Sequence, residues 1–299
     1  MKWLNYHHLH YFWVVAREGS IVRACEQLQL SQPTISCQIK ELEQAFGRKL
    51  FDRVGRRLVL TDAGRIVYKY ASEIFSVGQE LMGAMEQRPV DRLLKLSVGV
   101  VDCIPKTVVR LLLEPAWQLP HPVSLICREG KVDHLLSELA AHEVDVVLSD
   151  APIGTAVHLS GFNHLLGECG VTFFAEAKLA ARLAKGFPRS LHGAPMLLPS
   201  DNAALRRSLN LWFDTQQIRP RVVAEFDDSA LMNSFGRTGA GVFPAPSIVE
   251  AEIRRQFGGR VVGHAKGVRE RVYAISVEQK LKHPAVIAIC EAARRELFQ

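Results

Sequence analysis

The chain has 299 residues, of which 48% are hydrophobic and 23% charged, and this composition is that of a folded globular protein and not of a disordered chain. A chain of this length is predicted to form two or three domains that each bury a core. The net charge is +6, and residues 1–62 hold nine Lys and Arg against six Asp and Glu, a mild excess that is compatible with nucleic-acid binding without establishing it.

Cysteine usage and hydropathy point away from export and membranes. The six cysteines are scattered, with no C-x-x-C pair and no metal-ligand spacing, so we expect reduced thiols, no metal site and no cofactor. The first thirty residues contain no apolar signal segment, and no run of 18 apolar residues occurs. We therefore expect a cytoplasmic protein.

A helix over residues 5–17 is followed by two helices joined by a short turn. Ser20 is expected to cap a helix that ends near Leu28, and Ser31 to cap the next helix, which has Pro33 in its first turn, where a missing N–H is tolerated. In that second helix apolar residues recur at the spacing of a buried stripe: Ile35, Ile39, Leu42 and Phe46.

The opposite face of this second helix is small and polar near its N-terminus. A helix that enters the major groove of DNA needs short donors and acceptors there, and its N-terminus favours phosphate. Periodicity alone is equally compatible with an ordinary amphipathic helix pair. The expected base contacts are Ser31, Gln32, Pro33, Thr34 and Ser36.

A β-hairpin is predicted at residues 49–61, where two short apolar segments flank a glycine turn. Arginines in this hairpin can contact phosphates or the minor groove, although a solvated charge cluster would have the same composition. A helix pair followed by a basic hairpin is the pattern of a winged helix-turn-helix, here residues 1–61. The expected phosphate contacts are Lys40, Arg53, Arg56 and Arg57.

This region resembles the DNA-binding domain of the LysR-type transcriptional regulators. Residue types and spacing agree at residues 5–12, 19–20, 30–36, 39–43, 47–53 and 60–64. The resemblance implies a regulator that binds double-stranded promoter DNA as a dimer or tetramer and works with RNA polymerase. Cys37 departs from the pattern, because many relatives have an arginine there, and this removes an expected DNA contact.

Four later segments resemble the branch of this family that activates a sodium/proton antiporter gene: residues 167–171, 225–228, 230–232 and 283–286. That resemblance implies an activator that responds to sodium ion. The alternative is a LysR-type regulator of a different operon that responds to a small organic effector.

A long linker helix is predicted over residues 62–89, with Thr61 as its cap. A helix of about 40 Å between two globular parts cannot bury both faces against one small domain, so we expect it to pair with a second copy, although burial within its own chain is the alternative. Two series of apolar residues at seven-residue spacing form the expected dimer contact: Val67, Ile74 and Leu81, and Tyr70, Val77 and Ala84.

From residue 90 to 299, short apolar runs alternate with amphipathic helices, which is typical of α/β domains. Strands are expected at residues 94–101, 122–128, 144–149, 170–175, 196–198, 221–226, 241–243 and 272–277, with helices at 105–114, 132–142, 205–216, 229–235, 247–257 and 284–297. The resemblance implies two periplasmic-binding-protein-like lobes, residues 90–163 with 266–299 and residues 164–265. The predicted fold class is thus α+β overall: a winged helix-turn-helix, a linker helix and a two-lobed α/β effector domain.

Ligands of open α/β sheets bind beyond the carboxyl ends of the strands, which predicts an effector site in the crevice between the lobes. Several oxygen-bearing residues there suit a hard cation or a polar molecule. Ser200, Asp227 and Asp228 precede helices and can equally be N-caps. The candidate effector residues are Val101, Asp102, Glu129, Ser149, Asp150, Ser200, Asp201, Asn202, Asp227 and Phe243.

Enzyme motifs are missing from the sequence: it has no G-x-S-x-G, no H-E-x-x-H, no P-loop and no G-x-G-x-x-G after a strand. We therefore expect no enzymatic activity. A nonspecific nucleoid protein would carry more charge and no two-lobed ligand domain, and the affinity ratio between operator and random DNA separates it from a regulator.

Overall fold

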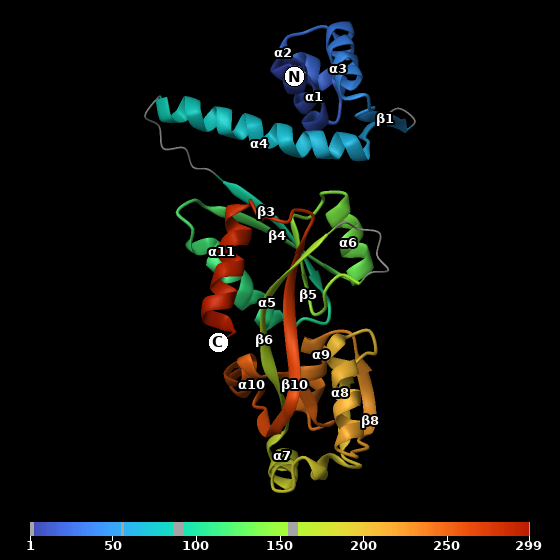
Figure 1. The fold of residues 1–299 in the computed structure, drawn as a ribbon, viewed down its shortest axis with the longest axis vertical. Helices are drawn as coiled ribbons and strands as arrows, with labels where there is room; N and C mark the ends of the chain where they lie inside the picture. The colour runs from blue at the N-terminus through green and yellow to red at the C-terminus, as the bar shows by residue number, and fades with distance from the viewer. Residues whose placement is uncertain (1–2, 55–56, 86–92, 155–160, 299) are drawn as a thin grey trace. The chain divides into compact units, whose positions relative to one another are not determined.

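The structure is a computed structural model that describes residues 3–54, 57–85, 93–154 and 161–298. The chain divides into two compact units, Met1–Arg92 and Leu93–Gln299 (Figure 1). None of the helices in the described ranges is both long and apolar enough to cross a membrane.

The first unit is helical with a two-stranded hairpin. Its helices bury one common core, whose fully buried members include Phe12, Ile35 and Leu50. β1 and β2 pair antiparallel from Phe51 opposite Leu60, which confirms the predicted wing. The elements are α1 (Tyr6–Glu18), α2 (Ile21–Leu28), α3 (Gln32–Phe46), β1 (Phe51–Val54), β2 (Arg57–Leu60) and α4 (Asp62–Met85).

Two of the three predicted caps in this unit are present. The Ser31 hydroxyl accepts from the Thr34 amide at 3.4 Å, and the Thr61 hydroxyl accepts from the Gly64 amide at 2.9 Å. Ser20 is at the N-cap position of α2, as predicted, but its side chain makes no capping hydrogen bond.

Gly64 shows why this position of the long helix is a glycine. A Cβ built there would lie 2.0 Å from the Leu50 carbonyl oxygen, since the first turn of α4 approaches the backbone just before the wing. Any larger residue would push α4 away from the core of the first unit.

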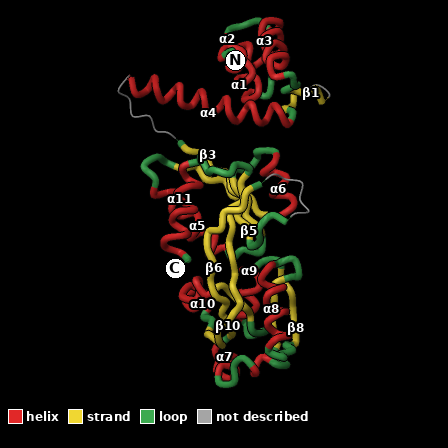
Figure 2. Tube along the Cα trace, in the orientation of Figure 1, coloured by secondary structure: helices red, strands yellow, loops and turns green. Residues whose placement is uncertain are grey.

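The second unit has two lobes joined by two long antiparallel strands, β6 (Phe162–Ala175) and β10 (Arg260–Ser276), which run through both lobes (Figure 2). The main sheet has the strand order β4-β3-β5-β10-β6-β9, and β7 and β8 form a separate parallel pair. The other elements of the first lobe are β3 (Leu94–Val101), α5 (Lys106–Leu113), β4 (Val123–Gly130), α6 (Val132–Ala140), β5 (Val146–Ser149) and α11 (Pro284–Ala292). Those of the second lobe are α7 (Ala177–Ala184), β7 (Pro195–Pro199), α8 (Ala204–Thr215), β8 (Arg221–Phe226), α9 (Ser229–Arg237), β9 (Phe243–Pro246) and α10 (Glu250–Phe257).

Strands β3 and β8 have the predicted bounds, whereas the two crossing strands were predicted too short. The first part of β6 pairs with the end of β10, whose residues 273–275 pair with β5 of the first lobe. The predicted lobe boundary at residue 164 falls within β6, which continues from one lobe into the other. Helix α7 was not predicted at all.

One further prediction is wrong, and part of another falls on residues that the structure does not describe. Phe46, expected in the buried stripe of α3, is 43% exposed, because it is the last residue of the helix and lies past the core. The linker helix is described to Met85, so residues 86–89 of the predicted helix lie outside the described residues.

Candidate functional site

Helix α3 divides into a buried and an exposed face. Ile35, Ile39 and Leu42 are almost fully buried, as predicted. On the other side Ser31, Gln32, Pro33 and Thr34 are exposed, whereas Ser36 is half-buried. Because the Ser31 hydroxyl also contacts the Thr34 hydroxyl at 2.8 Å, these two side chains hold each other at the helix start.

The wing is fixed to the end of α3 by one carboxylate. Glu43 Oε1 accepts from the backbone amides of Leu50 at 2.8 Å and Phe51 at 3.3 Å. Lys40 and Arg53 are exposed, and neither forms an ion pair with any residue that the structure describes. Arg56 lies outside the described residues, as does the side chain of Arg57, whose backbone belongs to β2.

The predicted apolar residues of α4 lie in two different environments, and the division does not follow the two series. Val67 and Ile74 pack, partly buried, against the core of the first unit. The prediction that these two residues form a dimer contact is therefore corrected, because the first half of α4 completes the core of its own chain. Trp13 of α1 also donates a hydrogen bond to Ser72 of α4 at 2.9 Å.

The remaining apolar residues of α4 are uncovered in the single chain. Tyr70 is 50% exposed, Val77 55% and Leu81 63%, and Met82 and Met85 extend this face. The side chain of Ala84 is not among the described ones. An apolar surface of this kind on a helix is a candidate contact for another protein surface.

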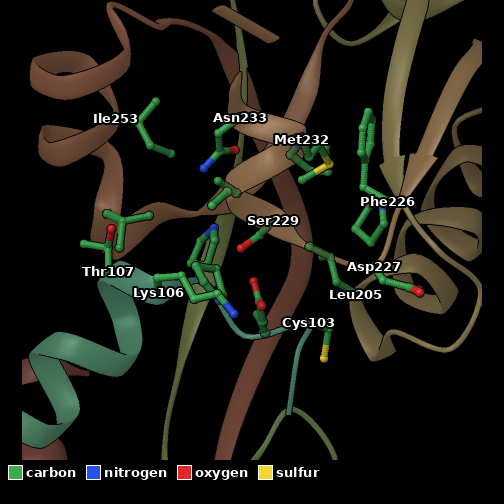
Figure 3. A pocket seen from close by; sticks show the side chains of 18 of the residues that line it. Cys103, Lys106, Thr107, Leu205, Phe226, Asp227, Ser229, Met232, Asn233 and Ile253 are labelled. Carbon is green, nitrogen blue, oxygen red and sulfur yellow. The ribbon is translucent and has the colours of Figure 1, made fainter. Parts of the chain in front are cut away.

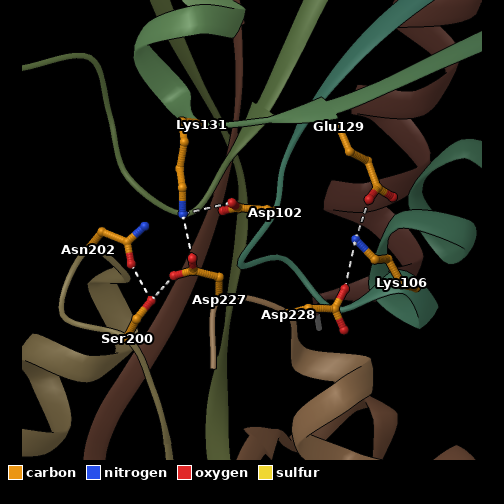
Figure 4. Close-up of polar contacts among 8 residues, drawn as sticks. All are labelled: Asp102, Lys106, Glu129, Lys131, Ser200, Asn202, Asp227 and Asp228. Atoms are coloured by element: carbon orange, nitrogen blue, oxygen red, sulfur yellow. Dashed lines mark hydrogen bonds and ion pairs between the residues drawn. The ribbon is translucent and has the colours of Figure 1, made fainter. Parts of the chain in front are cut away.

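In the second unit, two lysines join the lobes across the crevice (Figure 4). Lys131 Nζ lies 3.0 Å from Asp102 Oδ2 of the first lobe and 3.0 Å from Asp227 Oδ2 of the second. These bonds raise the pKa of Lys131, and bonds from Ser200 and Lys131 lower the pKa of Asp227.

The second bridge has the same arrangement. Lys106 Nζ lies 2.6 Å from Glu129 Oε2 of the first lobe and 3.6 Å from Asp228 Oδ2 of the second. Asp228 also accepts from the Leu231 amide at 2.7 Å, which confirms it as the cap of α9. Each lysine therefore ties one carboxylate from each lobe, so separating the lobes breaks both bridges.

The predicted caps at Ser200 and Asp227 are wrong. Ser200 donates to Asp227 and to Asn202 within the crevice, and α8 begins only at Ala204. The first amide of that helix instead donates to Asp150 Oδ2 of the first lobe, at 2.7 Å. Asp150 is thus a third link between the lobes.

Not all candidate residues face the crevice. Val101, Ser149 and Phe243 are buried in the cores of the lobes and are corrected to structural residues, since strand ends here point into the packing as well as outward. Asp201 is largely exposed and lies 3.6 Å from the Arg206 guanidinium. The predicted oxygen-rich set therefore does not converge on one point, and the described residues contain no group of three or more His, Cys, Asp or Glu side chains that could hold a metal ion.

A cavity of about 260 Å³ lies between the lobes (Figure 3). Its walls include Cys103 and Lys106 of the first lobe, residues from α9 and α10 of the second lobe, and Glu270 of the crossing strand β10. Burial raises the pKa of Glu270 to about 8, with Asp150 adding to the effect, and burial likewise raises the pKa of Cys103.

Sequence reasoning missed the residues that close this cavity. Glu270 lies in a part of β10 whose neighbours Arg269 and Arg271 are exposed and charged, so the segment does not have the pattern of a buried strand. The two lysines that bridge the lobes were also not predicted, because the residues that they join, such as Lys131 and Asp227, are far apart in the sequence. No local pattern in the sequence marked Glu270 as a residue of the cavity.

Comparison with known proteins gives the class of this protein. Residues 6–65 match the profile of bacterial regulatory helix-turn-helix proteins of the lysR family, and residues 94–298 match the LysR substrate binding domain. The chain belongs to the LysR family of transcriptional regulators, which confirms the resemblance and the predicted fold class.

Among its relatives is the transcriptional activator protein NhaR of Escherichia coli (strain K12), which is 36% identical over 298 residues, covering 100% of this chain and 98% of that protein. The HTH-type transcriptional activator CmpR of Synechocystis sp. is 25% identical over 291 residues, covering 96% and 93%. ArgP from Mycobacterium tuberculosis has a similar structure, with a TM-score of 0.64 at 19% identity over 99% of both chains. CbnR in complex with its target DNA has a TM-score of 0.56 at 20% identity, over 98% of this chain and 99% of CbnR.

Proposed function

We propose that this protein activates transcription of a sodium/proton antiporter gene in response to sodium ion. Support comes from its full-length similarity to the activator NhaR and from the segments at residues 167–171, 225–228, 230–232 and 283–286. The observation that carries the DNA-binding part is the exposed polar start of α3 over a fully buried stripe.

In this proposal α3 lies in the major groove and the wing contacts the backbone. Short side chains at the helix start can reach base edges, and exposed cations can neutralise phosphates. Base contacts come from Ser31, Gln32, Pro33, Thr34 and Ser36, and phosphate contacts from Lys40, Arg53, Arg56 and Arg57.

The uncovered apolar residues of α4 supply a contact between two copies. Tyr70, Val77 and Leu81 would be covered in a dimer or a dimer of dimers, which presents two α3 helices to half-sites about one DNA turn apart. Residues 1–61 form the DNA-binding domain, 62–89 the dimer helix and 90–299 the effector domain. We further propose a cytoplasmic regulator that works with RNA polymerase on promoter DNA and catalyses no reaction.

The crevice couples the effector to DNA by changing how the lobes close. A ligand can shift this equilibrium only by its difference in affinity for the two arrangements. The lysine bridges at Lys106 and Lys131 favour closure and are partly exposed, so each contributes up to about 1 kcal/mol and an effector can compete with them.

A second candidate is a LysR-type regulator of a different operon with a small organic effector. The cavity between the lobes favours it, because a space of about 260 Å³ is far larger than one ion and its walls include Phe226, Met232 and Ile253.

Footprinting upstream of a neighbouring antiporter gene, with and without sodium at constant ionic strength, tests the proposal. We expect protection of two half-sites and a change in the protected pattern with sodium but not with potassium. Identical patterns with the two ions would reject sodium as the effector, and unprotected DNA would reject the proposed target.

A further inference from the structure

The ionisable groups around the inter-lobe cavity have partners, with one exception. Lys106 is bonded to Glu129 and Asp228, and Asp227 is bonded to Lys131 and Ser200. Glu270 also lines the cavity, yet it is only 9% exposed and forms no ion pair with any residue in the described ranges. Its Oε2 atom is buried without a hydrogen-bond partner.

Helix α9 adds two more polar groups without partners. Asn233 is 8% exposed, and its Oδ1 atom is buried without a hydrogen bond. The hydroxyl oxygen of Ser229 is also buried without a hydrogen bond. The two residues are four apart on α9, so they share one face of the helix, and both line the cavity (Figure 3). A buried polar atom without a partner costs free energy, which a ligand that satisfies it recovers.

Apolar side chains make up much of the remaining wall and limit what the ligand can be. Phe226, Met232 and Ile253 border the space, together with several prolines. A volume of about 260 Å³ corresponds to about nine non-hydrogen atoms at the packing of liquid water. Buried polar atoms without partners, in a cavity that also has apolar side chains in its wall, fit a small molecule that has a cationic N–H group and a hydrocarbon body.

We propose that this cavity binds a small organic ammonium ion, whose N–H groups donate to Glu270 Oε2 and Asn233 Oδ1 while its hydrocarbon part packs on Phe226, Met232 and Ile253. This proposal deepens the second candidate function, a LysR-type regulator with a small organic effector, and rests on it. A bare sodium ion leaves most of the cavity unfilled, whereas an ammonium with a short alkyl chain fills it. Glu270 belongs to the strand β10, which crosses between the lobes, and Asn233 belongs to the second lobe. The ligand therefore connects β10 to the second lobe.

The test is a thermal-shift titration of the full chain with n-pentylammonium chloride at about pH 9, where the carboxyl of Glu270 is mostly ionised and the amine is still mostly protonated. We expect the melting temperature of the effector unit to rise by about 3 °C at about 10 mM ligand. 1-Pentanol and sodium chloride, at matched concentration and ionic strength, are expected to give no comparable rise. A rise with pentanol equal to that with the amine would overturn the proposal, and so would a rise with sodium chloride that Glu270→Gln abolishes.

Variants separate binding at this cavity from binding elsewhere. Glu270→Gln is expected to abolish the shift by the amine, whereas Glu291→Gln, at an exposed carboxylate on α11, leaves it intact. Asn233→Ala keeps the test valid if the glutamine variant does not fold, and it is expected to weaken binding about tenfold. An undiminished shift in the variants would show that the amine binds elsewhere.

The titration contains no DNA, so its failure leaves the proposed regulator function standing. A chain that bound the amine but no promoter DNA would retain the site and lose the function.

Discussion

Glu270→Gln should make the effector unit more stable near neutral and alkaline pH. The carboxyl of Glu270 has a pKa of about 8 in the folded chain, against 4.5 for an ordinary glutamate, because burial and Asp150 disfavour its ionised form. Between these two values the folded state keeps the proton and the unfolded state releases it. The unfolded state then binds fewer protons, so the contribution of this group to stability falls as the pH rises through this window.

The size of this effect follows from the difference between the two pKa values. At 1.36 kcal/mol per pKa unit, the separation corresponds to an upper bound of about 5 kcal/mol between pH values below and above the window. Glutamine is neutral at every pH and keeps the side-chain shape, so it removes this dependence. We therefore expect the variant to match the wild type near pH 4.5 and to exceed it by several kcal/mol above about pH 8.

Urea unfolding of the full chain, followed by tryptophan fluorescence across this pH range, measures the difference. Trp117 and Trp212 report on the effector unit. Glu291→Gln serves as the control, because the same chemical change at an exposed position should leave the pH dependence as in the wild type. Parallel stability curves for wild type and Glu270→Gln would refute the assignment of Glu270 as an unpaired buried carboxyl.

Four further changes test the other surfaces. Gln32→Ala should cost roughly 1–3 kcal/mol on the cognate promoter and relax base preference, measured by fluorescence anisotropy; equal losses on scrambled DNA would contradict base contact. Arg53→Ala should weaken binding to all sequences and reduce the salt slope by about one, so an unchanged slope would exclude a phosphate contact. Leu81→Asp places a charge on the apolar face of α4, where 63% of the leucine is exposed, and light scattering should then show monomers. A dimer as tight as that of the wild type would show that the dimer contact lies elsewhere. Lys131→Met leaves Asp102 and Asp227 facing each other and should lower effector-unit stability by roughly 1 kcal/mol, a loss that shrinks at about 1 M salt because exposed charges are screened, whereas a loss unaffected by salt would point to packing.

Local patterns predicted most of the elements, because the winged helix-turn-helix and the parallel strands carry short-range signals. The buried stripe through Ile35 and Ile39, and the apolar run of β3, need no tertiary information to be recognised. The two crossing strands were predicted too short for a physical reason. They pass between the lobes, so residues in their middle, such as Glu168 and Arg271, are charged. These two side chains pair with each other across the strands at 2.9 Å.

The sequence predicted where the candidate site lies but not which contacts its residues make. Asp102 and Asp227 come at the ends of strands and do meet across the crevice, but their shared partner Lys131 starts a helix with no signal of its own. Val101 and Phe243 were predicted as lining residues, although strand ends alternate between crevice and core, and their apolar side chains take the core side. The cavity at Glu270 depends on burial produced by several segments that are distant in sequence, which no local pattern reveals.

The central claim is that the helix beginning after Ser31 reads nucleobases. The most direct measurement is the ratio of affinities of the full chain for its promoter fragment and for a scrambled fragment of the same length, at one stated salt concentration. A sequence-reading regulator predicts a ratio of about 10³ or more. A ratio near one would show binding through phosphates alone and would contradict the account.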